Sequence, residues 1–301
     1  MPVQMRSLSR RKGRSRSGRT DMHRIPTTVW MDFTGVYADR RYTQEQKETG
    51  RPCTGRETYI SCRDISGTNC YCDEDAVKKL AARMESCPVK GVHFIDSGNY
   101  HYISRLWLSF LKAPFQLLVF DNHTDMQPPA FGGLLSCGGW LADALNGVPC
   151  LEKVLLAGPD EKAYSEADPD GKARVCLLSR EELAGARQEN ALSGLFRERC
   201  RGFSAGRPLY ISIDKDVLSP AFARTGWSQG DMSLPELLSM LKLLEEQMKE
   251  NRIPLLGVDV CGECDPDDTG GMRINREANR LLAEWAAGSV LWTQEGADYE
   301  E

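Results

Sequence analysis

Residues 117–127, which read LLVFDNHTDMQ, constrain the fold of this chain more than any other segment. Four apolar residues without alternation are typical of a strand that is buried on both faces of a sheet. Asp121, His123 and Asp125 follow at every second position, a spacing that points side chains to one side of a strand end. Carboxylates left unpaired there would repel each other and be costly to desolvate. A divalent cation relieves both problems, since carboxylate and imidazole suit manganese, zinc or iron; the alternative is a polar loop with an incidental histidine.

Two further strand ends carry the same kinds of side chain. Residues 209–216, LYISIDKD, are an apolar strand that ends in Asp214 and Asp216, and residues 92–95 are followed by a glycine-containing turn that leads to His101. One D-x-D alone is weak evidence, because it is most often a solvated loop. The three strand ends together supply two imidazoles and four carboxylates. This set is sufficient to hold two divalent ions that share a carboxylate and activate a water molecule between them.

Apolar strands alternate with amphipathic helices along most of the chain. This alternation predicts an α/β fold with three α/β/α layers around a doubly wound, mainly parallel sheet. Ligands bind such a sheet at the carboxyl ends of its strands, where all the motifs above fall. The predicted strands are 28–33, 58–62, 92–95, 117–120, 153–156, 174–178, 208–213 and 255–260, and the predicted helices are 73–87, 103–111, 190–201, 235–249 and 273–287.

The two ends of the chain differ from its body in charge. The first 20 residues carry seven Arg and Lys and no acidic residue, so we expect a disordered basic head over residues 1–24. A nucleic-acid-binding arm and a translation start placed too early, with Met22 opening the folded part, are alternative interpretations. Residues 25–290 are expected to form a single domain and 291–301 an acidic tail. Without the first 20 residues, 31 basic residues face 43 acidic ones, which makes the body a poor surface for nucleic acid.

Cysteine usage and hydrophobicity indicate the compartment. The eleven cysteines are odd in number and no apolar leader is present, which favours a reduced, cytoplasmic setting over a disulfide framework. Cys70 with Cys72, and Cys261 with Cys264, leave a zinc site as an alternative, although no second pair has zinc-finger spacing. No apolar run reaches the ~18 residues that a membrane span needs, so no membrane partner is expected.

The order of the motifs resembles that of the ureohydrolases, the arginase and agmatinase family of binuclear manganese enzymes. The motifs are G-x-x-H at 98–101, D-x-H-x-D at 121–125 and S-x-D-x-D at 212–216, and residues 258–266 resemble the family's strand ending in E-x-N-P. The resemblance covers about residues 29–285. It implies an arginase-like fold, a small cationic substrate, and a homo-oligomer that is a trimer or a hexamer.

The resemblance also implies a role for each candidate residue. A metal-bridging hydroxide would attack a C–N bond of a guanidine or amidine-type molecule, Asp125 would accept its proton, and Glu263 would bind the substrate guanidinium. The alternative for Glu263 is a carboxylate on a helix or loop surface. Two Mn²⁺ or other divalent ions would be bound, with Asp121 and Asp214 shared, by His101, Asp121, His123, Asp125, Asp214 and Asp216.

Two departures from the family pattern concern the substrate side of the site. The family has a proton-shuttle histidine after an S-G-N turn, and here Trp140 or Leu141 stands in that place, with Cys137 as the nearest candidate donor. Trp227 stands where a small residue is expected, so Trp140 and Trp227 are predicted to reshape the substrate pocket. These departures predict weak arginine hydrolysis. They also favour an alternative, a metalloprotein of the same fold that acts on another amide or imine, or that lacks guanidine hydrolysis.

Overall fold

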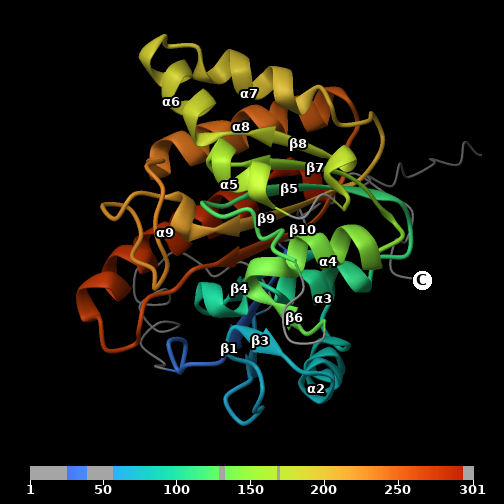
Figure 1. The fold of residues 1–301 in the computed structure, drawn as a ribbon, viewed down its shortest axis with the longest axis vertical. Coiled ribbons are helices and arrows are strands. Elements are labelled where there is room, and N and C mark those ends of the chain that lie inside the picture. The colour runs from blue at the N-terminus through green and yellow to red at the C-terminus, as the bar shows by residue number, and fades with distance from the viewer. Residues whose placement is uncertain (1–25, 39–56, 129–132, 168–169, 294–301) are drawn as a thin grey trace, which may run out of the picture.

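A computed structural model of the chain describes residues 26–38, 57–128, 133–167 and 170–293 (Figure 1). The basic head predicted at 1–24 and residues 294–301 of the predicted acidic tail lie outside the described residues. The strands of the sheet begin and end within two residues of the bounds predicted from the apolar runs. The strands are β1 (Thr27–Asp32), β2 (Glu57–Ser61), β3 (Tyr71–Cys72), β4 (Gly91–Ile95), β5 (Phe115–Phe120), β6 (Leu135–Ser136), β7 (Leu151–Ala157), β8 (Val175–Leu178), β9 (Leu209–Asp214) and β10 (Leu255–Cys261).

Eight of these strands form one parallel sheet in the order β2-β1-β4-β10-β9-β5-β7-β8. The four central strands, β4, β10, β9 and β5, are buried along their whole length, which explains why their sequences lack polar alternation. The predicted parallel α/β fold is confirmed. A short antiparallel pair, β3 with β6, was not predicted because two residues are too few to show a period.

Helices cover both faces of the sheet and complete the three layers (Figure 1). Helices α2 to α4 pack with one hydrophobic cluster, and helices α6 to α9 pack with a second one on the opposite face. Helices α4, α5 and α6 were not predicted. The helices are α2 (Glu74–Met84), α3 (Ile103–Ser109), α4 (Trp140–Gly147), α5 (Glu161–Glu166), α6 (Arg180–Gln188), α7 (Leu192–Cys200), α8 (Leu234–Glu250) and α9 (Thr269–Gly288).

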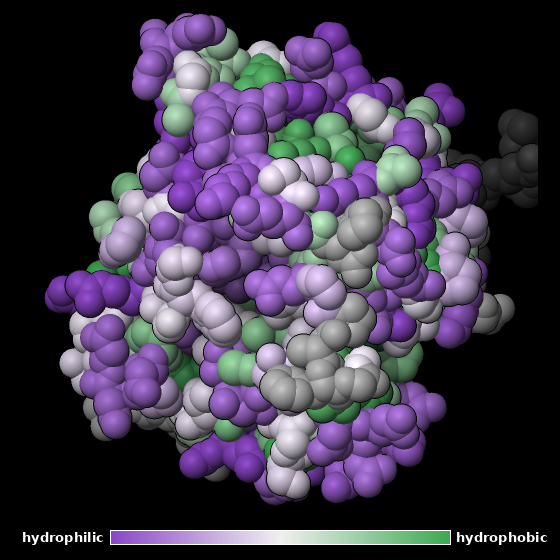
Figure 2. Space-filling model, viewed as in Figure 1, coloured by the Kyte–Doolittle hydropathy of each residue, from purple (hydrophilic) through white to green (hydrophobic). Residues whose placement is uncertain are grey.

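The surface is mainly hydrophilic, as expected when apolar side chains are buried between the layers. On the face that Figure 2 shows, hydrophilic residues predominate and apolar residues gather only in small groups, because most apolar side chains lie in the two clusters between the layers. Helix α7, predicted as exposed, still buries Phe196 and Cys200. Among the helices described, none has the length and apolar character needed to cross a membrane.

The order in which the chain visits the strands positions the site. The chain first builds β1, β2 and β4 on one side of the sheet and then β5, β7 and β8 on the other. It returns last to insert β9 and β10 between β4 and β5. The carboxyl ends of four central strands therefore meet, although they lie far apart in the sequence. Such a change in the direction of strand order is where doubly wound sheets bind their ligands.

Candidate metal centre

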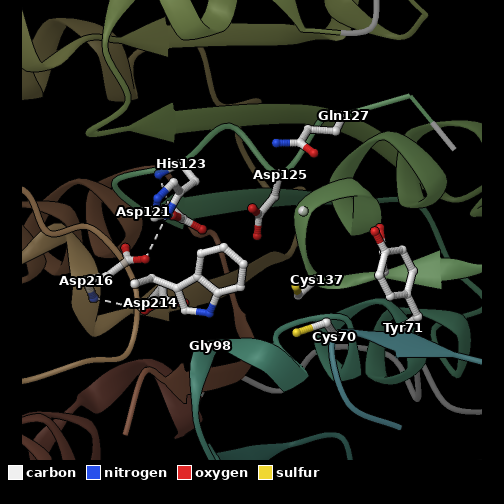
Figure 3. Close-up of a pocket in the computed structure, with 13 residues that line it drawn as sticks. Cys70, Tyr71, Gly98, Asp121, His123, Asp125, Gln127, Cys137, Asp214 and Asp216 are labelled. Atoms are coloured by element: carbon white, nitrogen blue, oxygen red, sulfur yellow. Dashed lines mark hydrogen bonds and ion pairs between the residues drawn. The ribbon is translucent and has the colours of Figure 1, made fainter. Parts of the chain in front are cut away.

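A cavity of about 240 Å³ opens at the carboxyl ends of the central strands (Figure 3). Five of the six predicted metal ligands line it, and the sixth, His101, contacts three of those five. The other lining residues come from the β3–β6 pair and from nearby loops. The lining residues are Cys70, Tyr71, Gly98, Asp121, His123, Asp125, Gln127, Ser136, Cys137, Gly138, Asp214, Asp216 and Trp227.

The deeper part of the centre, which we call the inner position, lies around His101 Nδ1. This nitrogen is 3.0 Å from Asp125 Oδ2, 3.2 Å from Asp121 Oδ2 and 3.5 Å from Asp214 Oδ2. The other ring nitrogen, Nε2, lies 2.9 Å from the hydroxyl of Ser212. This contact orients the imidazole so that Nδ1 faces the carboxylates, as a partner behind a metal-binding histidine commonly does.

The second part, the outer position, lies around His123 Nδ1. This nitrogen is 2.8 Å from Asp216 Oδ2 and 3.6 Å from Asp121 Oδ1, while Nε2 contacts the Ser228 hydroxyl at 2.8 Å. Asp121 therefore belongs to both positions. Asp214 groups with His101 in the inner position, and its predicted sharing between two ions stays a prediction.

The electrostatics of the centre fit a bound cation. Neither His101 Nδ1 nor Asp121 Oδ2 forms a hydrogen bond with any described residue, although both atoms are buried. Burial and the charge of Asp121 raise the pKa of Asp125 to about 7, and burial and Asp214 raise the pKa of Asp216 well above its ordinary value. Carboxylates close to one another and an imidazole nitrogen without a hydrogen bond are the ligand types that a divalent cation prefers, so the residues fit such an ion.

Asp125 is held in place by helix α4. Its φ of +48° lies in the left-handed region, which costs a residue with a side chain roughly 1–2 kcal/mol. Two contacts offset this strain: Trp140 Nε1 donates to Asp125 Oδ2 at 2.6 Å, and Leu141 N donates to the Asp125 carbonyl at 2.9 Å. Trp140 is fully buried and does not line the cavity. It therefore meets the cavity only through Asp125 and forms no part of the cavity wall, while its predicted effect on a substrate pocket stays a prediction.

Trp227 lines the cavity, and its predicted effect on a substrate pocket stays a prediction. Its ring is 42% exposed, lies 5.9 Å from the His123 ring, and is fixed by Nε1 donating to Asn99 Oδ1 at 2.9 Å. A Cβ at Gly98 would approach Trp227 Cδ1 to 2.8 Å, so the glycine leaves room for the indole. Cys137 also lines the cavity, and burial raises the pKa of its thiol to about 12.

Glu263 is not brought to the cavity. Its Oε1 accepts hydrogen bonds from Lys215 Nζ at 2.5 Å, Asn279 Nδ2 at 2.6 Å and the Tyr37 hydroxyl at 2.9 Å, and its Oε2 accepts one from Asn275 Nδ2 at 3.0 Å. Glu263 lies away from the cavity because Lys215, which is fully buried, requires a carboxylate partner. Glu263 is thus neither in contact with the substrate cavity nor on a surface.

The sequence analysis did not identify the two serines that contact the ligand imidazoles. Ser212 lies two positions before Asp214 on the same face of β9, so the spacing within S-x-D-x-D could have indicated its role. Ser228 lies in an irregular loop and carries no such signal. Every described cysteine is free, and no described candidate metal cluster contains the pairs predicted as an alternative zinc site: only Cys261 joins one, beside His101.

Comparisons with known proteins agree with this geometry. The model of the arginase family matches residues 40–286. An uncharacterized protein from Thermotoga maritima is 29% identical over 258 residues, covering 83% of this chain and 85% of that protein, and guanidinopropionase from Pseudomonas aeruginosa is 26% identical over 236 residues, covering 72% and 69%. The solved structure of proclavaminate amidino hydrolase from Streptomyces clavuligerus has a TM-score of 0.63 at 17% identity, covering 90% of this chain and 93% of that one.

Proposed function

The chain belongs to the arginase family, and we propose that it is a binuclear metal-dependent hydrolase acting on a C–N bond of a guanidine or amidine-type small molecule. The observation that carries this proposal is the pair of ligand groups that share Asp121, with His101 Nδ1 and Asp121 Oδ2 buried and without hydrogen bonds among the described residues. Buried polar atoms that form no hydrogen bond are rare in native proteins, and a bound cation would account for these two.

Two divalent cations, Mn²⁺ or other divalent ions, would be held at the two positions. When bound, they would supply Lewis acidity and activate a water molecule as the nucleophile. Ser212 and Ser228 orient the two imidazoles. Asp125, which Trp140 holds in place, would accept a proton from the attacking water. The ligands would be His101, Asp121, Asp125 and Asp214 at the inner position, and Asp121, His123 and Asp216 at the outer one.

Trp227 is the residue that would recognise a planar cation. Its exposed ring borders the cavity next to His123, and guanidinium and amidinium groups stack on indole faces. Gln127 and Ser136 offer polar contacts for the rest of a small substrate. The names of two relatives, guanidinopropionase and proclavaminate amidino hydrolase, point to the same substrate class. Glu263 would contribute indirectly: it binds Lys215, which lies in the sequence between the two proposed ligands Asp214 and Asp216, and it does not contact the substrate.

One observation favours the second candidate function, action on another amide or imine. No histidine other than the proposed ligands lies at the cavity in the described part of the chain, since His93 is buried against Tyr210 and Asp259. General acid catalysis is typically worth ~10²–10⁴-fold, and a strongly basic leaving amine depends on it most. Substrates whose leaving nitrogen is less basic, or that lose ammonia, suit this site better than arginine does.

Release of urea and ammonia from a small panel tests the proposal. The manganese-loaded protein is assayed with arginine, agmatine, 3-guanidinopropionate and acetamidine, with Asp121→Ala as the inactive control. We expect turnover of at least one guanidine or amidine and weak turnover of arginine. Rapid arginine hydrolysis would contradict the argument from the missing donor and make Cys137 the residue to test. Two bound ions without turnover of any compound would favour the second function.

Two properties of the whole protein belong to the same proposal. The family resemblance implies a homo-oligomer, trimer or hexamer, and the cysteine usage implies a cytoplasmic location. Light scattering coupled to size-exclusion chromatography measures the first directly, and a molar mass of one chain would contradict it.

A further inference from the structure

A third group of metal-ligand side chains overlaps the inner position and includes a thiol. Cys261 is the last residue of β10 and lies opposite Asp214 of β9 in the register of the sheet. Its Sγ donates to Asp214 Oδ2 at 2.9 Å. The ligand atoms of His101, Asp214 and Cys261 all lie within 4.8 Å of one another.

The backbone after Cys261 explains how the thiol comes so close. Gly262 has a φ of +90°, and a Cβ there would approach Asp214 Oδ1 to 2.5 Å. A residue with a side chain would push the end of β10 away from the end of β9. Glycine lets the two strand ends close on each other, which brings the thiol beside the ligand carboxylate.

The imidazole and the thiol of this group share a neighbour, Asp214 Oδ2, which accepts from Cys261 Sγ and lies 3.5 Å from His101 Nδ1. His101 Nδ1 is buried, forms no hydrogen bond with any described residue, and lies 3.0 Å from Asp125 Oδ2 and 3.5 Å from Asp214 Oδ2. A cation seated among these atoms would have Cys261 Sγ within reach as well. A buried thiol often packs simply as a small apolar residue. Packing alone does not account for a thiol that donates to a carboxylate oxygen, beside a buried imidazole nitrogen that contacts carboxylates but forms no hydrogen bond.

We propose that Cys261 is a ligand of the inner ion, so that the two positions differ in the metal they prefer. This inference rests on the proposed function, because it assumes that the inner position holds a cation. Upon binding, the thiol would lose its proton to solvent, and the Asp214 oxygen that accepted the S–H would become free to contact the ion. The resulting site is one of mixed sulfur, nitrogen and oxygen donors, whereas the outer position has only nitrogen and oxygen.

The donor sets predict the metals. Thiolate is a soft ligand that favours zinc, while carboxylate and water suit manganese. The inner position therefore selects a zinc-type ion and the outer position keeps its preference for manganese. Protein offered both metals should take up one of each.

X-ray absorption at the zinc edge tests the ligand without relying on activity. In the wild-type protein loaded with one equivalent of zinc, we expect a sulfur neighbour at about 2.3 Å. The sulfur neighbour should vanish in Cys261→Ser and remain in Cys264→Ser. Cys264 is the matched control because it is a buried thiol three residues away that contacts the Asp268 carbonyl and lies in no described metal cluster.

A cobalt titration and a competition experiment complete the test. Cobalt-loaded wild type and Cys264→Ser should show a sulfur-to-cobalt charge-transfer band in the near ultraviolet, and Cys261→Ser should not. In Cys261→Ser we also expect zinc affinity to fall at least about tenfold, since changes that merely disturb a ligand's orientation already cost that much. Circular dichroism checks that the variant is folded.

The outcomes separate this inference from the proposed function. If the wild-type protein binds two ions per chain and its zinc has only nitrogen and oxygen neighbours, Cys261 is a packing residue and the inference is overturned, while the binuclear centre stands. If the wild-type protein binds no divalent cation at all, the proposed function and the inference both fail.

Discussion

The candidate metal centre and the group around Glu263 are two buried clusters of charged and polar side chains that differ in how their carboxylates are neutralised. The Glu263 group (Tyr37, Lys215, Glu263, Asn275 and Asn279) contains its own cation. Burial by itself would raise the pKa of Glu263, but the charge of Lys215 together with the hydrogen bonds from Lys215, Asn275 and Asn279 outweighs burial and lowers that pKa. In the metal centre, burial and the charge of Asp121 raise the pKa values of Asp125 and Asp214.

The two sets adjoin each other along the chain, at Asp214, Lys215 and Asp216. Both aspartates line the cavity, whereas Lys215 extends to the other side, into the Glu263 group. One set contains its own permanent cation and is therefore structural. The other sets its carboxylates against two imidazoles, which carry charge only when protonated, and leaves buried atoms without hydrogen bonds, and we propose that a bound cation completes it. In this protein, buried charge indicates a functional site where the chain supplies no permanent counter-charge.

Removing the internal cation should have the largest effect. Lys215→Met keeps most of the side-chain volume but leaves Glu263 buried and unpaired, so we expect the free energy of unfolding to fall by about 3–5 kcal/mol. Urea denaturation measures it. The double variant Lys215→Met, Glu263→Gln should recover much of this loss, because no charge is then stranded. A loss below about 1 kcal/mol in the single variant would show that the pair is not the counter-charge we infer.

Removing a shared ligand should abolish metal binding instead. Asp121→Ala should lower metal content from two ions per chain to none, and with it the stabilisation by metal, about 2.7 kcal/mol at a free metal concentration 100 times the Kd. The double variant Lys215→Met, Glu263→Gln is the matched control, because it removes a buried carboxylate outside the centre without leaving a charge unpaired, and it should keep both ions. Elemental analysis of the purified variants measures the number of ions per chain. Full occupancy in Asp214→Ala would contradict the predicted sharing of that residue.

The effect of pH should depend on whether metal is present. In the metal-free protein the pKa of Asp125 is raised to about 7 and that of His123 to about 11, so folding takes up protons at both. Their contribution to stability is therefore present at low pH and declines as pH rises, through about 7 for Asp125 and onward from the ordinary histidine pKa for His123.

A bound cation expels these protons and reverses the trend. The stabilisation by manganese should therefore grow between pH 5.5 and 8, by about 1.4 kcal/mol per pH unit for each proton released, and Tm should rise with it. Thermal unfolding with and without manganese at several pH values measures this stabilisation, and the double variant Lys215→Met, Glu263→Gln should show the same trend. A metal-induced shift that is equal at both ends of this range would contradict the proposed ligand set.

The smallest effect is expected at the cavity wall. Trp227→Ala should change KM several-fold, since a cation over an exposed ring is worth about 0.5–1 kcal/mol. Metal content should stay at two ions and Tm nearly unchanged, because the indole touches no buried charge. Trp227→Phe keeps an aromatic face and should recover part of the affinity. Loss of metal in the alanine variant would show that Trp227 supports His123 and not the substrate.

Most of the sheet and the six candidate ligands could be predicted because their signals are local. A strand buried on both faces is apolar without interruption, and alternate positions at its end share one side, so β5 and the D-x-H-x-D motif could be recognised within eleven residues. Helix α4 was missed since it has only eight residues and its N-cap, Gly139, offers no capping side chain.

The sequence by itself thus determined the parallel α/β architecture and the residues that gather at its centre. Only the tertiary structure decided which buried carboxylates lack a counter-charge. Glu263 pairs with Lys215 and with Asn275 and Asn279 of α9, and Cys261 meets Asp214, because β10 is inserted beside β9 late in the chain. Such contacts depend on which distant strands become neighbours and on the side to which each turn directs a side chain. Neither is recorded in a local pattern of residues.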